Sequence, residues 1–234
     1  MCFVYFVVQP HPPCMFEREN IFTRIREALT VRTHAQHGDS PSSTVEQRRV
    51  LPLVGATSGG QFALFQQNAV ELRADFQIVA DVLELETALL ALSRMHGWRK
   101  IAAHEGELSG AAARTLGLPV LSAGGGYDKN ELAACDAGIT ECDALIAQTG
   151  SVIVTSRDSG GRALSVLPPH HVVLVRWEQL VRDLSAGFDR VQKKYAPAYP
   201  SMISVVTGPS RTGDIERILV LGAHGPKKLT IICW

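Results

Sequence analysis

Cysteine is scarce in this sequence, and its spacing excludes the common metal-cluster motifs. No two of the five cysteines have the two-residue separation that is typical of zinc and iron–sulfur ligands. An odd, scattered set also argues against a disulfide framework. The five are Cys2, Cys14, Cys135, Cys142 and Cys233. We therefore expect reduced thiols in a cytoplasmic protein, with no metal and no cofactor bound by this chain.

The sequence also lacks an excess of charge of either sign and a long hydrophobic run. Its 23 basic residues balance its 23 acidic residues, which leaves no electrostatic footprint for nucleic acid or for an anionic membrane. The apolar run at residues 3–8 is far shorter than the roughly 20 residues of a membrane span. No positive charge precedes this run, as one would in a signal peptide. The sequence therefore predicts neither nucleic acid nor a membrane as a partner.

Helix-like and strand-like segments alternate along the chain. Apolar periodicity predicts helices over residues 17–29, 61–73, 85–95, 106–116 and 177–193. Short apolar runs predict strands over residues 76–80, 100–103, 119–121, 144–147, 152–155, 172–175, 203–206 and 229–233. Such alternation is typical of an α/β fold, with a mostly parallel sheet and helices on both of its faces.

The length of 234 residues suits one large domain or two small ones. We interpret residues 1–15 as an N-terminal extension and residues 16–234 as a single α/β domain. Its first part, residues 16–50, is expected to hold a helix and a linker. The linker is inferred because residues 34–49 are polar, rich in Ser and Gln, and interrupted by a proline.

The segment at residues 207–226 combines several features of an anion-binding site. A Gly-Pro turn is followed by Ser210 and Thr212, whose hydroxyls flank Arg211, and we predict a helix that begins near Asp214. A helix N-terminus favours negative charge, because its backbone N–H groups are unpaired and its dipole is positive there. The alternative is ordinary helix capping with Arg211 paired to a neighbouring acid.

Two further motifs precede this segment, and together the three resemble one protein family. The other motifs are Gly138-Ile139-Thr140 followed by residues 143–151, and Leu167-Pro168-Pro169-His170-His171-Val172-Val173. In residue content and order they resemble the lactate utilization protein C family, which is built on the LUD domain. The resemblance extends from about Phe16 to Leu229. The resemblance implies the Rossmann-like architecture of the NagB/RpiA/CoA-transferase group. One position departs from the family pattern, because Gln148 stands where glutamate is common.

The motifs supply two groups of candidate site residues. The candidate catalytic residues are His171, His224 and Gln148, and the candidate ligand-binding residues are Ser210, Arg211, Thr212, Thr149 and Gly150. Structural interpretations stay open: a helix dipole alone favours His224, and Gln148 could be the exposed tip of a turn. An amide cannot form the acyl anhydride of a CoA-transferase. Covalent CoA transfer is therefore excluded if Gln148 occupies the nucleophile's place.

Three loops follow predicted strands, and ligands in open parallel sheets bind beyond the carboxyl ends of strands. These loops are residues 124–126, 157–162 and 208–213. The triple glycine of the first loop lacks the spacing of a dinucleotide or phosphate-binding motif. We therefore interpret it as a flexible turn and place the ligand at the third loop.

The family resemblance implies a pathway more than a reaction. It implies a subunit or accessory component of a system that oxidises L-lactate to pyruvate. This component would bind a small anion, a carboxylate or a phosphate, and work with iron–sulfur partner proteins. One alternative is a stand-alone enzyme acting on a sugar phosphate, a CoA ester or a folate-like substrate. Another is a non-catalytic scaffold, so whether the chain is an enzyme stays open at this point.

Overall fold

The computed structural model describes two units of the chain. The described residues are 15–30, 54–55, 57–124, 126–157, 163–213, 219–222 and 225–234. The smaller unit, Met1–Val50, contains helix α1 (Met15–Thr30), and the larger unit is Leu51–Trp234. The helix predicted over residues 17–29 is confirmed. The linker predicted at residues 34–49 lies outside the described residues, as does the predicted extension apart from Met15.

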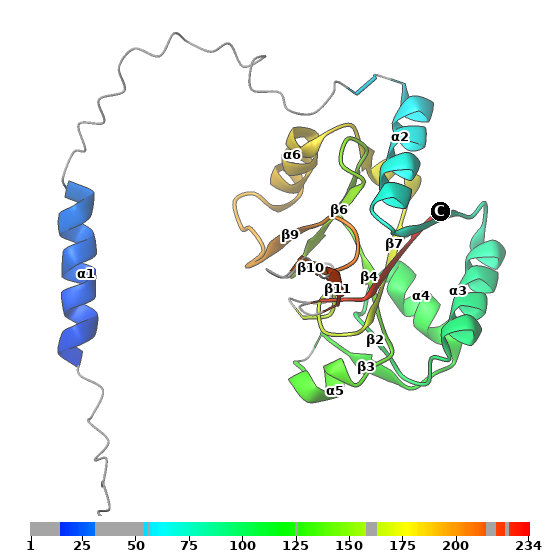
Figure 1. Cartoon of the computed structure of the whole chain (residues 1–234), viewed down its shortest axis with the longest axis horizontal. Helices are drawn as coiled ribbons and strands as arrows, with labels where there is room; N and C mark the ends of the chain where they lie inside the picture. The colour runs from blue at the N-terminus through cyan, green and yellow to red at the C-terminus, as the bar shows by residue number, and fades with distance from the viewer. Residues whose placement is uncertain are drawn as a thin grey trace, which may run out of the picture. The chain divides into compact units, whose positions relative to one another are not determined.

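A six-stranded sheet forms the centre of the larger unit, and all of its neighbouring strands are parallel (Figure 1). In sheet order the strands are β1 (Asp75–Ile78), β12 (Lys228–Cys233), β7 (His170–Val175), β4 (Ala137–Glu141), β2 (Ile101–Ala103) and β3 (Val120–Ser122). Parallel neighbours need crossover connections. Among the connections between strands of this sheet, that from β1 to β2 contains α3 (Val82–His96), that from β2 to β3 contains α4 (Glu107–Leu116), and that from β3 to β4 contains α5 (Lys129–Ala133). The predicted α/β class is confirmed.

Apolar side chains cover both faces of this sheet, because successive residues of a strand point to opposite sides. On one face Val172 and Leu174 of β7 pack with the buried leucines of α3 and α4. On the other face Val173 and Val175 pack with Phe65 of α2 (Ser58–Glu71) and with a second sheet. Figure 1 shows α3 and α4 together on one side of the strands, away from α6 (Leu184–Tyr195).

The second sheet has four strands, in the order β8 (Leu180–Val181), β5 (Ala144–Ile146), β6 (Ser151–Thr155) and β9 (Ile203–Val206). Its β5–β6 and β6–β9 pairs are antiparallel. The strands predicted at residues 144–147, 152–155 and 203–206 therefore exist, but they lie outside the parallel sheet. Because β6 and β9 are antiparallel, the loops that follow them start at opposite edges, and the predicted clustering of three loops at one edge is wrong.

Two helix predictions need correction, because tertiary pairing overrides local propensity. The helix predicted over residues 177–193 is right only in its second part, and the helix predicted beyond Asp214 is wrong at its described residues. Residues 177–193 contain a 3-10 turn (Trp177–Gln179), strand β8 and only then α6. The side chain of Asp183 accepts a hydrogen bond from the backbone N–H of Ala186, which sets the start of α6. The helix predicted beyond Asp214 is replaced at its described residues by a strand, since β10 (Arg211–Gly213) pairs antiparallel with β11 (Leu219–Leu221).

Strand β4 and helix α5 were missed by the sequence analysis. Gly138 lies within β4, although glycine is a poor strand former. A larger residue does not fit at this position, because an added Cβ atom would lie 2.5 Å from the carbonyl oxygen of Leu164. Within the described ranges, every helix is too short or too polar to cross a lipid bilayer.

Candidate functional site

The segments that follow β2 and β4 lie on opposite faces of the parallel sheet. After β2 the chain enters α4, which packs with α3 on one face, and after β4 it enters β5 and β6, which pack on the other face. β2 and β4 are direct neighbours in the sheet. Their carboxyl ends therefore form a topological switch point, which is where open α/β sheets commonly bind ligands.

A carboxylate from β4 caps helix α4 at this switch point. Glu141 Oε1 accepts hydrogen bonds from the backbone N–H groups of Leu108 (2.9 Å) and Ser109 (3.1 Å) and from the Ser109 hydroxyl (3.2 Å). The negative charge of the carboxylate is favoured there by the positive end of the helix dipole. His104 Nε2 lies 3.9 Å from the same carboxylate oxygen. Residues far apart in the chain thus form one polar cluster of His104, Ser109 and Glu141.

This cluster does not have the geometry of a Ser–His–acid catalytic relay. In such a relay the acid and the nucleophile contact opposite nitrogens of the imidazole. Here the Ser109 hydroxyl (3.5 Å) and the Glu141 carboxylate (3.9 Å) both approach Nε2 of His104. The Ser109 hydroxyl also lies 3.1 Å from the carbonyl oxygen of His104. We infer that the cluster positions the loop after β2 and does not activate a nucleophile.

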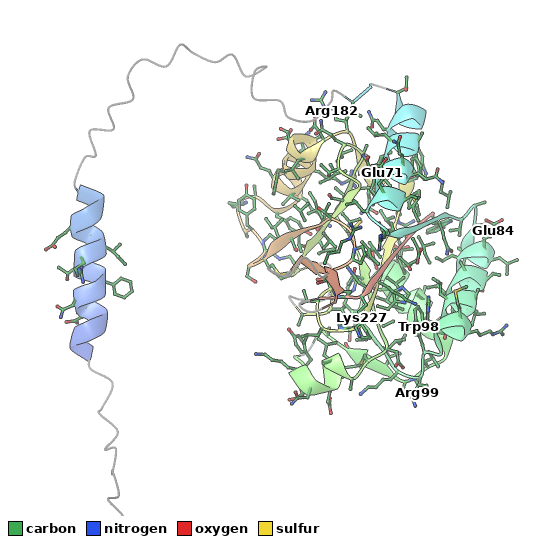
Figure 2. The ribbon with its side chains drawn as sticks, viewed as in Figure 1. Glu71, Glu84, Trp98, Arg99, Arg182 and Lys227 are labelled. Carbon is green, nitrogen blue, oxygen red and sulfur yellow. The ribbon has the colours of Figure 1, made fainter. Side chains whose placement is uncertain are left out.

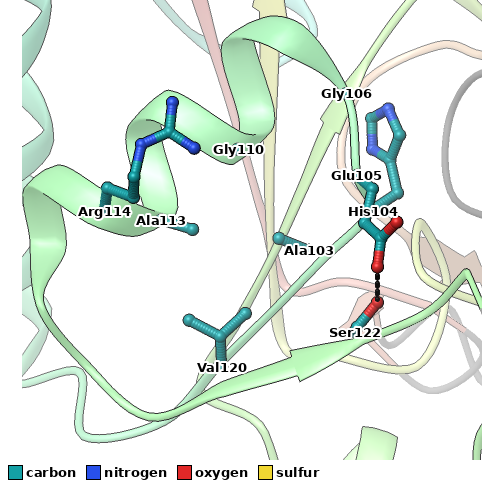
Figure 3. A pocket seen from close by; sticks show the side chains of 9 residues that line it. All are labelled: Ala103, His104, Glu105, Gly106, Gly110, Ala113, Arg114, Val120 and Ser122. Carbon is teal, nitrogen blue, oxygen red and sulfur yellow. Dashed lines mark hydrogen bonds between the residues drawn. The ribbon is translucent and has the colours of Figure 1, made fainter.

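A cleft of about 270 Å³ opens beside this cluster, between α4 and the edge strand β3 (Figure 3). Its lining residues are Ala103, His104, Glu105, Gly106, Gly110, Ala113, Arg114, Val120 and Ser122. Ser122 donates a 3.4 Å hydrogen bond to Glu105, which closes one end of the cleft. Arg114 lies on the α4 wall, and in the described part of the chain it has no ion pair with a carboxylate. The cleft therefore offers a cation, a hydroxyl and an acid to a small ligand.

Sequence reasoning missed this cleft, although one signal for it was present. The polar run His104-Glu105-Gly106 directly follows the strand that was correctly predicted at residues 100–103. By the carboxyl-end rule this run was a candidate loop. Glu141 gave no such signal, because its strand β4 was not predicted and its partner α4 is remote in sequence.

The structure brings two of the sequence-predicted motifs together through hydroxyl groups. The Ser151 hydroxyl lies 2.8 Å from the Thr149 hydroxyl and 2.8 Å from the Thr207 hydroxyl. The turn at residues 147–150 and the beginning of the segment at residues 207–213 are therefore adjacent. The candidate residues Thr149 and Gly150 lie in this turn, and Ser210 and Arg211 follow Thr207.

The candidate anion residues Ser210 and Arg211 are engaged in local structure. The Ser210 N–H donates to the carbonyl oxygen of Pro226 (2.9 Å), and the Ser210 carbonyl accepts from the Gly222 N–H (3.0 Å). The guanidinium of Arg211 donates to the backbone carbonyl of Leu72. Thr212 lies in β10. Anion binding at these residues stays a prediction, and the described part of the helix on which it was based is the strand β11 (Leu219–Leu221).

Comparison with known proteins adds a family assignment to this geometry. The sequence model of the LUD domain family matches residues 117–233, which is half of the chain. The match covers β4, the turn at residues 147–150 and the segment at residues 207–226. The chain belongs to the LUD domain family.

Relatives named "Lactate utilization protein C" are similar to this LUD chain. The protein of that name from Deinococcus radiodurans is 36% identical over 119 residues, which is 50% of this chain and 55% of the relative. That from Shouchella clausii is 29% identical over 180 residues, covering 72% of this chain and 76% of the relative. The chain thus spans about half the length of the Deinococcus relative.

A solved structure supports the LUD fold. The crystal structure described as a duf162 family protein from Deinococcus radiodurans superposes with a TM-score of 0.61 at 23% identity. The superposition covers 76% of this chain and 99% of the solved chain. At this identity the likeness concerns the fold alone, and it agrees with the parallel sheet described above.

The LUD-family turn that contains Gln148 is held against α2 and is not an exposed tip. The side-chain amide of Asn68 donates to the carbonyl oxygens of Ala147 (2.8 Å) and Gln148 (3.0 Å). Gly150 has a φ of 63°, and an added Cβ atom would lie 2.8 Å from Asn68. Gln148 itself is half-buried. The glycine of this motif is therefore needed for close packing on α2 and for its left-handed backbone.

We expect Asn68→Ala to lower the free energy of unfolding by about 1–2 kcal/mol, because two backbone carbonyls of the turn lose their donor. Urea unfolding followed by circular dichroism measures this loss. The matched control is Gln67→Ala on the same helix, since Gln67 bonds only the exposed Glu71 in the described structure. Equal losses in the two variants would show that Asn68 does not hold the turn.

The two adjacent histidines of the LUD domain lie on opposite faces of β7, as the strand geometry predicts. His171 Nε2 lies 2.8 Å from the Thr140 hydroxyl, whereas His170 Nε2 lies 2.8 Å from the Thr230 hydroxyl. His171, a candidate catalytic residue, does not face a loop: its side chain is buried in the core and only 1% exposed. Burial lowers the pKa of His171 to about 3. His224 lies outside the described residues.

The described cysteines of the LUD domain are core thiols. Cys135, Cys142 and Cys233 are free and buried. Burial raises the pKa of Cys142, and it raises the pKa of Cys233 to about 12, so both are protonated at neutral pH. Among the described residues, no three His, Cys, Asp or Glu side chains are grouped so that they could hold a metal ion.

Proposed function

We propose that this LUD-family chain is a component of a lactate-utilization system and binds a small carboxylate in the cleft between α4 and β3. Family membership and relatives named for lactate utilization support the pathway. The observation that carries the binding site is the cleft itself, in which Arg114 has no carboxylate partner among the described residues.

The lining of the cleft suits a short hydroxy or keto acid. A guanidinium binds a carboxylate through paired N–H donors, which makes arginine the residue of choice for such a ligand. Ala103, Ala113 and Val120 form an apolar wall that can accept a methyl group. Ser122 and Glu105 supply polar atoms for the oxygen next to the carboxylate. Lactate and pyruvate combine these three features in one small molecule.

We further propose that iron–sulfur partner proteins transfer the electrons of lactate oxidation. The described cysteines favour electron transfer by partner proteins, because they are separate thiols within apolar layers of the core. Cys142 and Cys233 pack in one layer, and Cys135 packs in another beside α5. Such thiols are stable as packing residues and would have to leave the core to ligate a cluster.

Replacing Arg114 tests the carboxylate site. We expect L-lactate or pyruvate to stabilise the full chain against heat, and Arg114→Gln to weaken that binding about tenfold or more. The loss of one charge-assisted hydrogen bond, about 1.5–3 kcal/mol, accounts for such a decrease. Isothermal titration calorimetry measures the dissociation constant, and ligand-induced thermal stabilisation provides a second readout.

Two further variants make this test decisive. Arg94→Gln changes an exposed arginine of α3 outside the cleft and should leave binding unchanged. Arg211→Gln tests the site predicted at residues 210–212. If Arg211→Gln abolishes binding and Arg114→Gln does not, the ligand belongs at the segment of residues 207–213. If neither acid binds at millimolar concentration, a carboxylate-binding function is wrong.

A further inference from the structure

A second cavity lies at the opposite edge of the parallel sheet, where strands begin. It has a volume of about 200 Å³ and lies at the amino ends of β4, β7 and β12, beside the end of α3. Its lining residues are His96, Trp98, Asp136, Pro169, His170, Lys227 and Lys228. Figure 2 labels Trp98 and Lys227, two of these lining residues. The carboxyl-end rule for ligand sites does not account for such a polar cavity.

Two sequence motifs that the proposed function does not use converge on this cavity. The carbonyl oxygen of Pro169 accepts hydrogen bonds from the backbone N–H groups of Lys227 (2.8 Å) and Lys228 (3.2 Å). In the sheet, Lys228 is the register partner of His170. The Leu-Pro-Pro-His-His entry to β7 and the Gly-Pro-Lys-Lys entry to β12 are thus held together. This pairing places two ammonium groups at one short sheet edge.

In the described structure, no ion pair matches the positive charge at this edge. Among the described residues, neither Lys227 nor Lys228 forms an ion pair with a carboxylate. Lys228 Nζ instead lies 3.0 Å from His96 Nδ1. An ammonium can only donate, so Nδ1 accepts and the proton of the neutral imidazole is on Nε2. The pKa of His96 is lowered by burial and by Lys228, which agrees with a neutral ring. Nε2 of His96 is therefore an N–H donor.

The wall of the cavity contains a buried histidine with an unused polar atom. His170 is 3% exposed, and its Nδ1 atom has no hydrogen-bond partner in the described part of the structure. Its ring packs edge-on against His96 (4.8 Å between centroids) and Trp98 (5.3 Å). Buried polar atoms are normally satisfied, and an exception needs an explanation, of which a bound water or ion is one. The cavity lies directly against this ring.

We propose that this amino-edge cavity is a second binding site, for a small oxyanion that carries a hydroxyl group, held by Lys228, Lys227 and His96. The two ammonium groups and the His96 N–H donate to the anionic oxygens. Asp136 also lines the cavity, and its Oδ2 atom accepts from the N–H groups of Arg99 (2.7 Å) and Lys100 (3.0 Å). A carboxylate in the lining favours a ligand with a hydroxyl donor over a plain anion.

This site can be tested by titrating the full chain with inorganic phosphate and, separately, with glycolate. The first is a hydroxylated phosphorus oxyanion and the second a hydroxylated carboxylate. The readout is the set of histidine side-chain resonances in the labelled protein, with His96→Gln used to assign the His96 signal. We expect a saturable shift of the His96 and His170 signals with one or both probes. Phosphate alone would identify a phosphate ligand, and glycolate alone a hydroxy acid, and either supports the site.

Lysine variants decide whether the shift comes from the amino-edge cavity. We expect Lys228→Gln to weaken binding about tenfold or more and Lys227→Gln to weaken it less, because charge-assisted hydrogen bonds are lost. Lys193→Gln on α6 is the matched control and should bind as the wild type does. Retained binding in Arg114→Gln would separate this site from the α4–β3 cleft. No saturable shift with either probe, or the same affinity in Lys228→Gln as in wild type, would overturn the proposal.

Discussion

We expect acidification from pH 7 to pH 4 to lower the free energy of unfolding by about 6 kcal/mol through two buried histidines. Burial lowers the pKa of His171 to about 3 and is the main reason that the pKa of His170 falls to about 4, against 6.5 for an unperturbed imidazole. The unfolded chain therefore binds protons at these residues before the folded chain does. Each histidine contributes about 1.4 kcal/mol per pH unit between its two pKa values.

The sign of this effect follows from which state takes up the proton. Above pH 6.5 both states hold neutral imidazoles, and the stability that these residues contribute is complete. As the pH falls through 6.5, protons bind the unfolded chain first, so stability decreases until the folded pKa values are reached near pH 4 and pH 3. Urea unfolding at pH 7, 6, 5 and 4 measures the slope directly.

Glutamine variants separate the histidines from the carboxylates, which also lose stabilising contacts in acid. We expect His171→Gln to reduce the slope between pH 6 and pH 4 by about 1.4 kcal/mol per pH unit. The double variant with His170→Gln should retain only the slope that the carboxylates cause. A slope that is the same in the wild type and in both variants would show that these imidazoles do not titrate as buried groups.

We expect Gly106→Ala to destabilise the protein by about 3 kcal/mol and to disrupt the α4–β3 cleft. An added Cβ atom would lie 2.1 Å from Glu141 Oε1, 2.4 Å from His104 Nε2 and 2.6 Å from the Ser109 hydroxyl. Three polar groups would have to move at once. The main loss is the carboxylate cap, because the N–H groups of Leu108 and Ser109 would no longer have their acceptor. Loss of a cap and crowding in a packed site each cost about 1–2 kcal/mol.

Helix α4 contains its own control for this substitution. Gly110 lies one turn further along α4, where an added Cβ atom would have Arg114 Nη1 as its nearest neighbour, at an ordinary 3.6 Å. Gly110→Ala should therefore raise the free energy of unfolding by up to about 1 kcal/mol, because alanine is the better helix former. Thermal unfolding of the two variants should shift in opposite directions. Equal shifts would mean that the Glu141 carboxylate is not packed against Gly106.

Local sequence was sufficient for the class of fold and for the strands with continuous apolar character. The run at residues 172–175 predicts a buried strand, and β7 is buried along its whole length. The helices with distinct ends were also found, such as α3, which begins after Asp81 and ends at Gly97 in a left-handed conformation. In these segments the hydrophobic period and the capping residues depend only on neighbours in the chain.

Elements that depend on distant partners could not be predicted. Leu180 and Val181 have the pattern of a helix, but they pair with β5, which is more than thirty residues earlier. Gly138 weakens the strand pattern of β4, and its place is fixed by the carbonyl of Leu164 packing over it. The Arg211 segment was predicted to open a helix, yet it pairs with Leu219–Leu221 as a hairpin. Pairing partners, rather than local propensity, determine these conformations.

The candidate sites also combine features that the sequence predicts with features that only the tertiary structure shows. From sequence, the three motifs were sufficient to identify the family, and the carboxyl-end rule was sufficient to suggest loops after strands. The chemistry at the switch point needed Glu141 from β4 to meet the first turn of α4, and the amino-edge cavity needed β7 and β12 to lie side by side. Parallel strands become neighbours through long crossovers, so the side chains at their ends meet independently of their separation in sequence. The family and the fold class could therefore be predicted from the sequence alone. Both proposed binding sites could be found only in the tertiary structure, because the sheet brings their residues together.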